Sequence, residues 1–172
     1  MKTFLLSLLL LNLGGWNLKS QTKVPVLRFQ ELKENIQENK SSVQVINFWA
    51  TWCAPCVREI PYFQAVHEKY QNQSVRFLLV SLDSSKKLAR VERFVKKKKL
   101  SMEIVLLNET DFDTILPQIH PNMEGAIPAT LFLCGKKTKG SFIHDSFSQK
   151  KLFQRDLSQK ELEKEVKACL NR

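Results

Sequence analysis

The sequence lacks the features that divide a chain into several domains. Its 172 residues contain no internal repeat, no low-complexity tract and no linker built from its 5 glycines and 6 prolines. Once the first twenty residues are set aside as a targeting segment, about 150 remain, which is enough for one domain with a proper core. We therefore expect a single domain over residues 21–172.

A long hydrophobic run is also missing. Lys2 supplies a positive charge and residues 4–11 a short apolar core, which two glycines then end. This run is too short to span a bilayer comfortably, and no cysteine follows it closely, which argues against a lipoprotein anchor. We expect residues 1–20 to be a cleaved signal peptide and the protein to be periplasmic, where disulfides persist. An uncleaved membrane anchor is the alternative.

Acidic residues are scarce. Asp and Glu number 17 against 27 Lys and Arg, and the net charge is +10. The first twenty residues hold two lysines and no acid, so +8 remains without them. The charge is concentrated at residues 96–99, with lysine pairs at 86–87, 136–137 and 150–151. Such a run attracts acidic partners or anionic membranes, although a solvated helix end is the plainer interpretation. Basic and aromatic residues do not interleave, so we expect no nucleic-acid binding.

Cofactor motifs are missing too. We find no flavin, haem or nicotinamide motif, and His67, His120 and His144 show no metal-ligand spacing among themselves. The cysteines are therefore expected to be the whole redox centre, with no cofactor and no metal. Asp83 and Asp145 lie near the ends of predicted strands and have no partner that the sequence identifies.

The most informative feature present is a pair of cysteines, Cys53 and Cys56, between an apolar β-prone run and a helical pattern. This context places the first sulfur at or near a helix N-terminus, where unpaired N–H groups and the helix dipole stabilise a thiolate. A structural disulfide or half of a zinc site is the alternative, but a second ligand pair with suitable spacing is missing. The context favours redox chemistry.

The residues around these cysteines suggest a division of roles. Cys53 is expected to attack a partner disulfide, and Cys56, one turn along and more buried, to resolve the mixed disulfide. Ala54 and Pro55 lie between them, and neither is a cation that would strongly stabilise the thiolate. The motif therefore favours a reductase or isomerase over a strong oxidant.

Apolar periodicity predicts an α/β fold, a central mixed sheet with helices on both faces and an antiparallel hairpin at its end. Strands are expected at residues 24–28, 43–49, 75–82, 103–107, 128–133 and 141–147. Helices are expected at residues 29–39, 53–70, 88–99, 111–119 and 159–170, with a kink at Pro61 and an interruption near Pro117.

Residues 48–61 (FWATWCAPCVREIP) resemble the active-site signature of the TlpA/ResA-type thiol-disulfide oxidoreductases of the thioredoxin superfamily. Residues 125–130 (GAIPAT) resemble the cis-proline loop of that family. The resemblance covers the chain from about residue 24 to the C-terminus and implies a thioredoxin-like fold. It also implies that Pro128 is cis and that the Ile127 backbone pairs with an extended substrate, a trans proline at a strand start being the alternative.

The resemblance assigns further roles near the cysteines. Trp52 is expected to form part of the apolar surface beside the sulfurs, while Trp49 packs under them or belongs simply to the core. Thioredoxins carry a buried aspartate at the position of Asn47, which cannot titrate. In ResA-like members a glutamate at the position of Glu59 is linked to proton transfer. Glu59 is therefore expected to accept the Cys56 proton, with a pKa raised by partial burial; a glutamate that only interacts with the helix dipole is the alternative.

The implied function is an exported enzyme, a monomer, that exchanges a Cys53/Cys56 dithiol with protein disulfides, more as a reductant, and draws electrons from a membrane electron-donor protein. Apocytochrome c (hence cytochrome c biogenesis), a periplasmic oxidoreductase or misoxidised proteins would all fit as substrates. The alternative is a copper-handling assembly protein on the same fold, although these show CxxxC with a distal histidine. A peroxiredoxin-type peroxidase needs a single cysteine in a Thr-x-x-Cys context, which the twin motif argues against. Cys134 and Cys169 are expected to be separate buried thiols, with a disulfide between them as the alternative.

Overall fold

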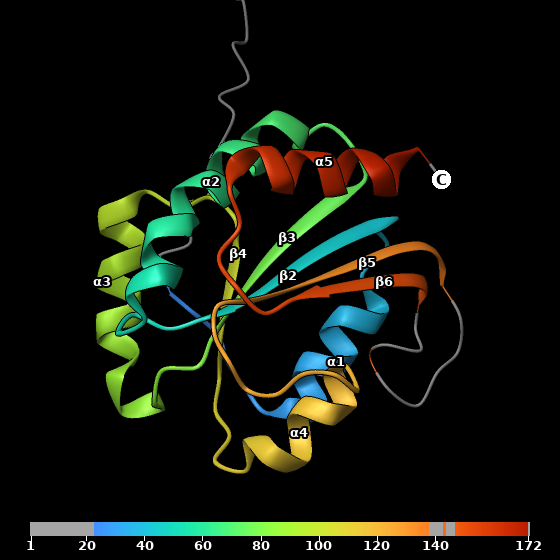
Figure 1. Cartoon of the computed structure of the whole chain (residues 1–172). Helices are drawn as coiled ribbons and strands as arrows, with labels where there is room; N and C mark the ends of the chain where they lie inside the picture. The colour runs from blue at the N-terminus through green and yellow to red at the C-terminus, as the bar shows by residue number, and fades with distance from the viewer. Residues whose placement is uncertain (1–22, 138–142, 144–146, 172) are drawn as a thin grey trace, which may run out of the picture.

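The computed structural model describes residues 23–137, 143 and 147–171 of the chain (Figure 1). The expected signal peptide, His144 and Asp145 lie outside these ranges. None of the helices in the described ranges is both long enough and apolar enough to cross a bilayer.

Six strands of the described chain form one mixed sheet. They are β1 (Val26–Leu27), β2 (Val43–Trp49), β3 (Val75–Ser81), β4 (Glu103–Leu107), β5 (Ala129–Lys137) and β6 (Phe147–Phe153). Their order across the sheet is β1-β4-β3-β2-β5-β6. The first four are parallel, whereas β5 is antiparallel to both of its neighbours. The β5–β6 hairpin therefore closes one edge, and β2, which precedes the two cysteines, lies inside the sheet.

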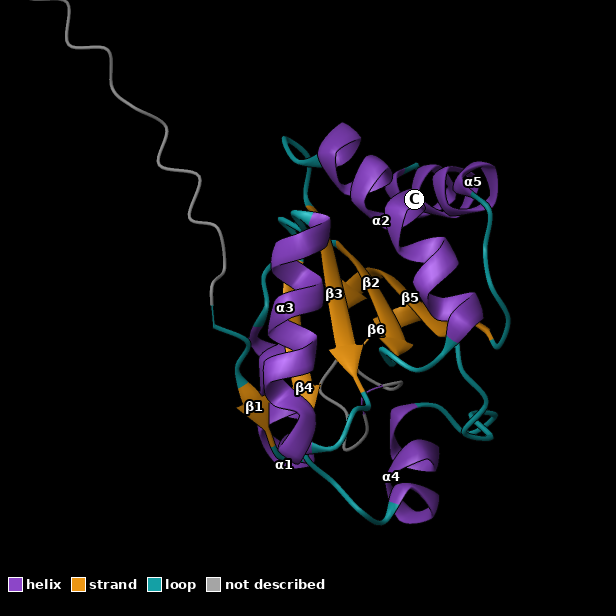
Figure 2. Ribbon diagram, turned by 90° about the vertical axis from the view of Figure 1, so that its left-hand side faces the viewer, coloured by secondary structure: helices purple, strands orange, loops and turns teal. Residues whose placement is uncertain are grey.

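Helices cover both faces of this sheet (Figure 2). They are α1 (Phe29–Glu38), α2 (Ala54–Tyr70), α3 (Leu88–Lys98), α4 (Phe112–Ile119) and α5 (Gln159–Leu170). In Figure 1, α2 and α5 lie above the sheet and α1 and α4 below it. The buried side chains of α3 belong to the same apolar cluster as those of α2 and α5.

The central strands explain where the active-site region is placed. β2 and β3 are buried along their whole length because helices cover the sheet on both sides. Side chains alternate between the two faces of a strand. Trp49 packs with α2, α3 and α5 on one face, and Phe48 packs with α1 and α4 on the other. Asn47 has the same parity as Trp49, so a polar side chain is buried on the α2 face of the sheet.

The predicted α/β class and the mixed sheet are confirmed, and the strand at 43–49 and the helix at 159–170 have the predicted bounds. The structure differs from three of the predictions in detail. The strand that pairs with β5 is β6, which begins at Phe147, where the predicted strand at 141–147 ends; residues 141, 142 and 144–146 lie outside the described residues. Because β6 is an edge strand, its exposed polar residues show no apolar pattern. The helix α4 contains Pro117 without the predicted interruption, and β1 is shorter than predicted.

Candidate active site

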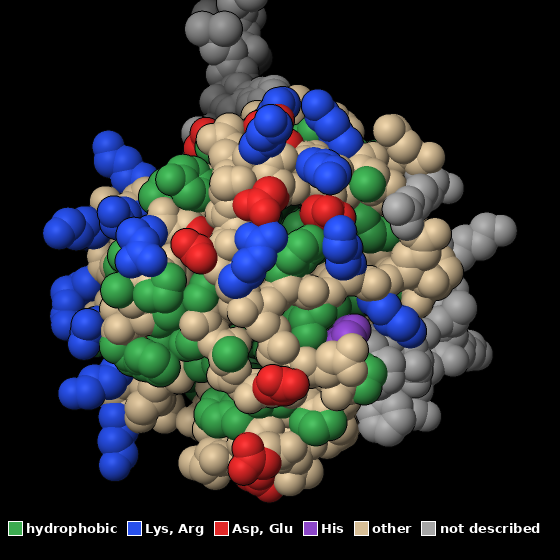
Figure 3. Space-filling model, in the orientation of Figure 1, with side chains coloured by type: hydrophobic (Ala, Val, Ile, Leu, Met, Phe, Trp, Pro, Cys, Tyr) green, Lys and Arg blue, Asp and Glu red, His purple; other side chains and the backbone are tan. Residues whose placement is uncertain are grey.

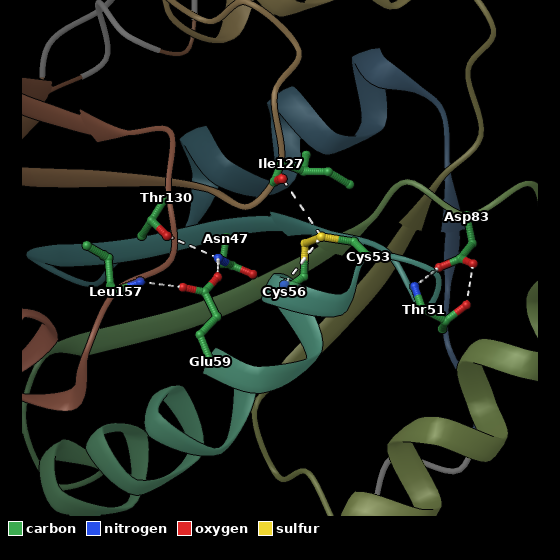
Figure 4. Close-up of a disulfide and its surroundings, with 9 residues drawn as sticks. All are labelled: Asn47, Thr51, Cys53, Cys56, Glu59, Asp83, Ile127, Thr130 and Leu157. Atoms are coloured by element: carbon green, nitrogen blue, oxygen red, sulfur yellow. Dashed lines mark hydrogen bonds between the residues drawn. A yellow bond between two sulfur atoms is a disulfide. The ribbon is translucent and has the colours of Figure 1, made fainter.

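The two cysteines lie where the carboxyl end of β2 passes into α2 (Figure 4). Cys53 is the N-cap residue of α2 and has an extended backbone, with φ −86° and ψ 101°. Pro55 follows in the first turn, where a helix needs no N–H donor from it. Cys53 and Cys56 form a disulfide with their Cα atoms 5.3 Å apart. The predicted position of the first sulfur at a helix N-terminus is confirmed.

The two sulfurs have unequal surroundings. Cys53 keeps 6% of its surface exposed, whereas Cys56 is fully buried. The Cys56 N–H donates a hydrogen bond to Cys53 Sγ at 3.3 Å. Because this donor belongs to the first turn of α2, it and the helix dipole both favour a negative charge on Cys53 when the disulfide opens. The more accessible sulfur is therefore the one that is better prepared to act as a thiolate.

The loop before β5 lies against these sulfurs. The Ile127–Pro128 peptide bond is cis, as the resemblance implies. The carbonyl oxygen of Ile127 lies 3.8 Å from Cys53 Sγ (Figure 4). Trp52, which directly precedes Cys53 in the chain, is 63% exposed, the largest exposure among the large apolar side chains of the described chain. Trp49 is fully buried in the apolar cluster that contains both cysteines.

Glu59 is a buried carboxyl group one helical turn after Cys56, and only 1% of its surface is exposed. Asn47 Nδ2 donates to its Oε1 at 2.8 Å, and the Leu157 N–H donates to its Oε2 at 2.7 Å. Burial raises the pKa of Glu59 from its ordinary 4.5 to about 7, against the lowering effect of these two hydrogen bonds, while the nearby Asp156 charge adds to the rise. Glu59 can therefore both release and accept a proton near neutral pH.

Asn47 connects Glu59 to the rest of the sheet. Its Nδ2 also donates to Thr130 Oγ1 at 3.0 Å on the neighbouring strand β5. The Oδ1 atom of Asn47 has no hydrogen-bond partner among the described residues, although the side chain is fully buried. The sequence shows that residue 47 is an asparagine, which cannot titrate. It does not show that the Asn47 amide donates a hydrogen bond to the Glu59 carboxyl group.

Asp83, for which the sequence identified no partner, fixes the loop that leads to the cysteines. Its Oδ2 accepts from the Thr51 N–H at 2.8 Å and its Oδ1 from the Thr51 hydroxyl at 2.6 Å (Figure 4). The Ser81 hydroxyl also donates to Asp83 Oδ2, at 2.9 Å. The sequence did contain an indication of this contact. Asp83 follows β3, and the carboxyl ends of the adjacent parallel strands β2 and β3 meet at the same edge of the sheet.

Cys134 and Cys169 form a second disulfide, between β5 and α5, with Cα atoms 5.3 Å apart. The expectation of two separate thiols is therefore wrong, and the alternative pairing is correct. Both residues lie on apolar stripes that face the same core cluster, so each looks like an ordinary buried cysteine in the sequence. What the sequence did not show is that α5 packs directly over β5.

The histidines of the described chain have ordinary packing partners. His67 meets the Phe77 ring edge-on with centroids 5.7 Å apart, and burial lowers the pKa of His67. The Asn122 N–H donates to His120 Nδ1 at 3.2 Å. Within the described residues, no group of three or more His, Cys, Asp or Glu side chains could hold a metal ion.

Comparison with known proteins places this site in a family. The model of the AhpC/TSA family matches residues 21–138. Sporulation thiol-disulfide oxidoreductase A of Bacillus subtilis (strain 168) is 33% identical over 99 residues, which cover 54% of this chain and 60% of that protein. Thiol-disulfide oxidoreductase ResA of Geobacillus thermodenitrificans (strain NG80-2) is 41% identical over 61 residues, covering 36% of this chain and 34% of that protein. The chain thus matches between a third and three fifths of the length of these two relatives.

Solved structures give the same fold. The crystal structure of StoA from Bacillus subtilis superposes with a TM-score of 0.52 at 26% identity, covering 74% of this chain and 84% of that one. A thioredoxin-related protein from Neisseria meningitidis serogroup B superposes with a TM-score of 0.62 at 22% identity, covering 79% of this chain and 90% of that one. The predicted thioredoxin-like fold is therefore confirmed.

Proposed function

This chain belongs to the AhpC/TSA family, and from that premise we propose that it is a thiol-disulfide oxidoreductase that exchanges its Cys53–Cys56 pair with disulfides of other proteins. The observation that carries the proposal is the unequal disulfide at the start of α2, in which Cys53 keeps 6% of its surface exposed and Cys56 is fully buried. The names of the similar Bacillus and Geobacillus proteins support the same activity. A peroxidase with one reactive cysteine is less well supported, because the two sulfurs are bonded to each other.

The reaction runs in two exchange steps when the dithiol form meets a partner disulfide. The Cys53 thiolate attacks one partner sulfur, a mixed disulfide forms, and the partner's other sulfur leaves as a thiolate. The Cys56 thiolate then attacks Cys53 Sγ and expels the partner's remaining sulfur. The pair has lost two electrons and has become the disulfide, and the partner has gained both as a dithiol.

Glu59 is the acceptor of the Cys56 proton in the second step. It lies one helical turn from Cys56, and its pKa of about 7 suits a group that takes up and releases a proton at neutral pH. Asn47 and the Leu157 N–H orient the carboxylate by holding one oxygen each. Cys56 is fully buried, so its proton has no direct route to water, which makes an internal acceptor necessary.

The substrate segment lies between Trp52 and the loop of Ile127 and Pro128. Trp52 offers an exposed apolar surface beside Cys53. The Ile127 carbonyl, close to Cys53 Sγ, accepts a backbone N–H from an extended partner segment. The backbone contact accepts many sequences, so these three residues orient a partner disulfide rather than select one protein.

The preferred direction is reduction of the partner. Among the described contacts, Cys53 Sγ receives one N–H, from Cys56, and the Ile127 carbonyl on its other side carries a partial negative charge. A strong oxidant needs a reduced form with a highly stabilised thiolate. Equilibration with glutathione measures this directly: we expect a potential nearer to that of thioredoxin, about −270 mV, than to that of DsbA, about −120 mV.

The working context proposed for the enzyme follows from the N-terminal sequence. Residues 1–20 serve as a signal peptide, residues 21–172 form the single domain, and the protein acts as a monomer in the periplasm. A membrane electron-donor protein returns the Cys53–Cys56 pair to the dithiol form. The partners that the pair reduces are proteins of the same compartment, with apocytochrome c as one candidate.

The decisive experiment traps the mixed disulfide. Cys56→Ser should accumulate partner proteins attached to Cys53 in the native host, and dithiothreitol should release them for identification by mass spectrometry. Cys53→Ser is the matched control and should trap none. Absence of adducts in Cys56→Ser, together with failure of the wild-type pair to cycle with dithiothreitol, would refute the proposal.

A further inference from the structure

The outer surface of α3 and of the turn before it is strongly basic. Eight cations lie within fourteen residues and all are exposed: Lys86, Lys87, Arg90, Arg93 and residues 96–99. We call these eight residues the α3 cationic face. The single acid of this stretch, Glu92, is half-buried and accepts the Val24 N–H at 3.3 Å. The one acid among residues 86–99 therefore does not offset the eight positive charges of the α3 cationic face.

The packing of α3 fixes which way these charges point. Val91 and Val95 are buried in the core cluster, and the Phe94 ring packs on Trp49 with centroids 5.0 Å apart. With the apolar side of the helix held inward, the cations lie on the outside. No ion pair between the described residues involves any of them.

The cations that lie next to α5 differ in this respect. Lys69 of α2 pairs with Glu163 of α5 at 2.6 Å, and Lys151 of β6 pairs with Glu165 of α5 at 2.7 Å. Along α5 the lysines alternate with glutamates, so this helix carries mixed charge at its surface. Strong positive charge is therefore a property of the α3 side of the molecule and not of the whole surface.

The α3 cationic face adjoins the active site. Arg90 Nη2 donates to the Thr51 carbonyl oxygen at 3.5 Å, and Thr51 precedes the exposed Trp52 and Cys53. In Figure 3, Lys and Arg side chains line the left edge of the molecule, over α3, and apolar side chains lie next to them. A protein that brings a disulfide to Cys53 therefore approaches next to Arg90, from which the α3 cationic face continues along the helix.

We propose that the α3 cationic face recruits the redox partner, and that this partner is a protein whose exchanged disulfide lies beside a cluster of Asp and Glu side chains. This inference rests on the exchange activity proposed above and names the class of its substrate. A patch of one sign next to an active site raises the encounter rate with oppositely charged partners by ~10- to 1000-fold at low salt. The effect fades when the Debye length becomes short, at about 3 Å in 1 M salt.

The test uses the full chain and two disulfide-closed peptides that differ only in their flanks, three Asp residues on each side or three Ser residues. We expect the reduced protein to reduce the Asp peptide at least ~10-fold faster at low salt, and the advantage to vanish near 1 M NaCl. The uncharged hydroxyethyl disulfide serves as a common substrate. Its reduction reports on Cys53 and Cys56 alone.

Charge reversal locates the effect. Arg93→Glu with Lys97→Glu should remove the preference for the Asp peptide while leaving hydroxyethyl disulfide reduction unchanged. Lys164→Glu with Lys167→Glu makes the same change in net charge on α5 and should keep the preference. Equal rates with both peptides, or equal losses in both double variants, would overturn the inference.

Two further results would show which proposal has failed. One would refute the exchange activity itself, and the other would show that the α3 cationic face binds a membrane and not a protein. If no variant, wild type included, reduces hydroxyethyl disulfide, the proposed exchange activity itself fails. If the wild type sediments with phosphatidylglycerol vesicles but not with phosphatidylcholine vesicles, loses this binding on α3 reversal, and reduces both peptides equally, the face binds an anionic membrane, and the proposal of an acidic protein partner is wrong.

Discussion

The replacement Glu59→Gln tests the central physical argument, which is that burial gives this carboxyl group a pKa of about 7 in the folded protein. The unfolded chain has the ordinary value of 4.5. The folded state therefore keeps a proton that the unfolded state releases, and folding stability falls as the pH rises from about 4.5 through about 7. The difference between the two pKa values corresponds to roughly 3 kcal/mol, fully lost above pH 7.

Glutamine has a similar shape and does not titrate, so this loss should disappear in Glu59→Gln. We expect the stability of the variant relative to the wild type to increase by up to about 3 kcal/mol between pH 4 and pH 8. Urea unfolding of the oxidised protein at several pH values measures the difference, and all other titrating groups cancel because both proteins contain them. Glu163→Gln is the control. Because Lys69 holds the pKa of Glu163 below its ordinary value, the stability of this variant relative to the wild type should fall, not rise, as the pH increases.

The same replacement should slow the resolving step. A double release assay with an aromatic disulfide such as Ellman's reagent separates the steps, because attack by Cys53 releases the first chromophore and attack by Cys56 the second. We expect the second release to slow by ~100-fold or more near pH 7 in Glu59→Gln, with the first release little changed. The difference between the second-release rates of Glu59→Gln and the wild type should become smaller at higher pH, because Cys56 then ionises without a carboxylate to accept its proton.

Two results would refute this reasoning. A stability difference between Glu59→Gln and wild type that does not change with pH would mean that Glu59 has an ordinary pKa despite its burial. An unchanged second release across the pH range would mean that Cys56 loses its proton by another route. Asn47→Ala adds a directional check: its hydrogen bond lowers the pKa of Glu59, so its loss should raise that pKa further.

Three other replacements test neighbouring features. Asp83→Ala leaves the Thr51 N–H without its acceptor and should lower the free energy of unfolding by roughly 2–3 kcal/mol and slow exchange, measured by urea unfolding and insulin reduction. Removing the second disulfide with Cys134→Ala and Cys169→Ala, 35 residues apart, should lower the free energy of unfolding by about 4 kcal/mol under oxidising conditions and leave hydroxyethyl disulfide reduction intact at 25 °C. Trp52→Ala should raise the KM for a protein disulfide by ~5- to 30-fold without affecting that small disulfide; equal effects on both would contradict its role in partner binding.

The local part of the site could be predicted because it depends on neighbours in the sequence. An apolar strand followed at once by a helix places Cys53 at an N-cap, and the spacing of three places Cys56 and then Glu59 on successive turns. The resemblance to ResA-type oxidoreductases drawn from the same stretch is confirmed by the similar proteins. Segment order also predicted the class of fold, because strand–helix–strand units with apolar strands form parallel sheets covered on both sides.

The long-range part could not be predicted, because it depends on which loops and strands meet. The Leu157 N–H reaches Glu59 across 98 positions, and Asn47 reaches Thr130 across 83. A backbone N–H such as that of Leu157 can come from almost any residue type, so the sequence does not indicate which residue donates to Glu59. The Cys134–Cys169 pair was hidden for a related reason, since a cysteine that faces the core looks the same whether or not another cysteine lies opposite.

The two buried carboxyl groups of the described chain, Glu59 and Asp83, show why the position of an acid matters more than its burial. Asp83 follows β3, and its oxygens accept from the Thr51 N–H, the Thr51 hydroxyl and the Ser81 hydroxyl, so it serves to hold the loop. Glu59 lies on α2 itself, one turn beyond Cys56, and an amide rather than a carboxylate occupies the strand position at Asn47. A carboxylate at Asn47 would repel that of Glu59, and the two would titrate as a coupled pair. With asparagine there, Glu59 is the one buried carboxyl group on α2, and in the proposed mechanism it receives the proton of Cys56 while the Asn47 amide keeps it in position.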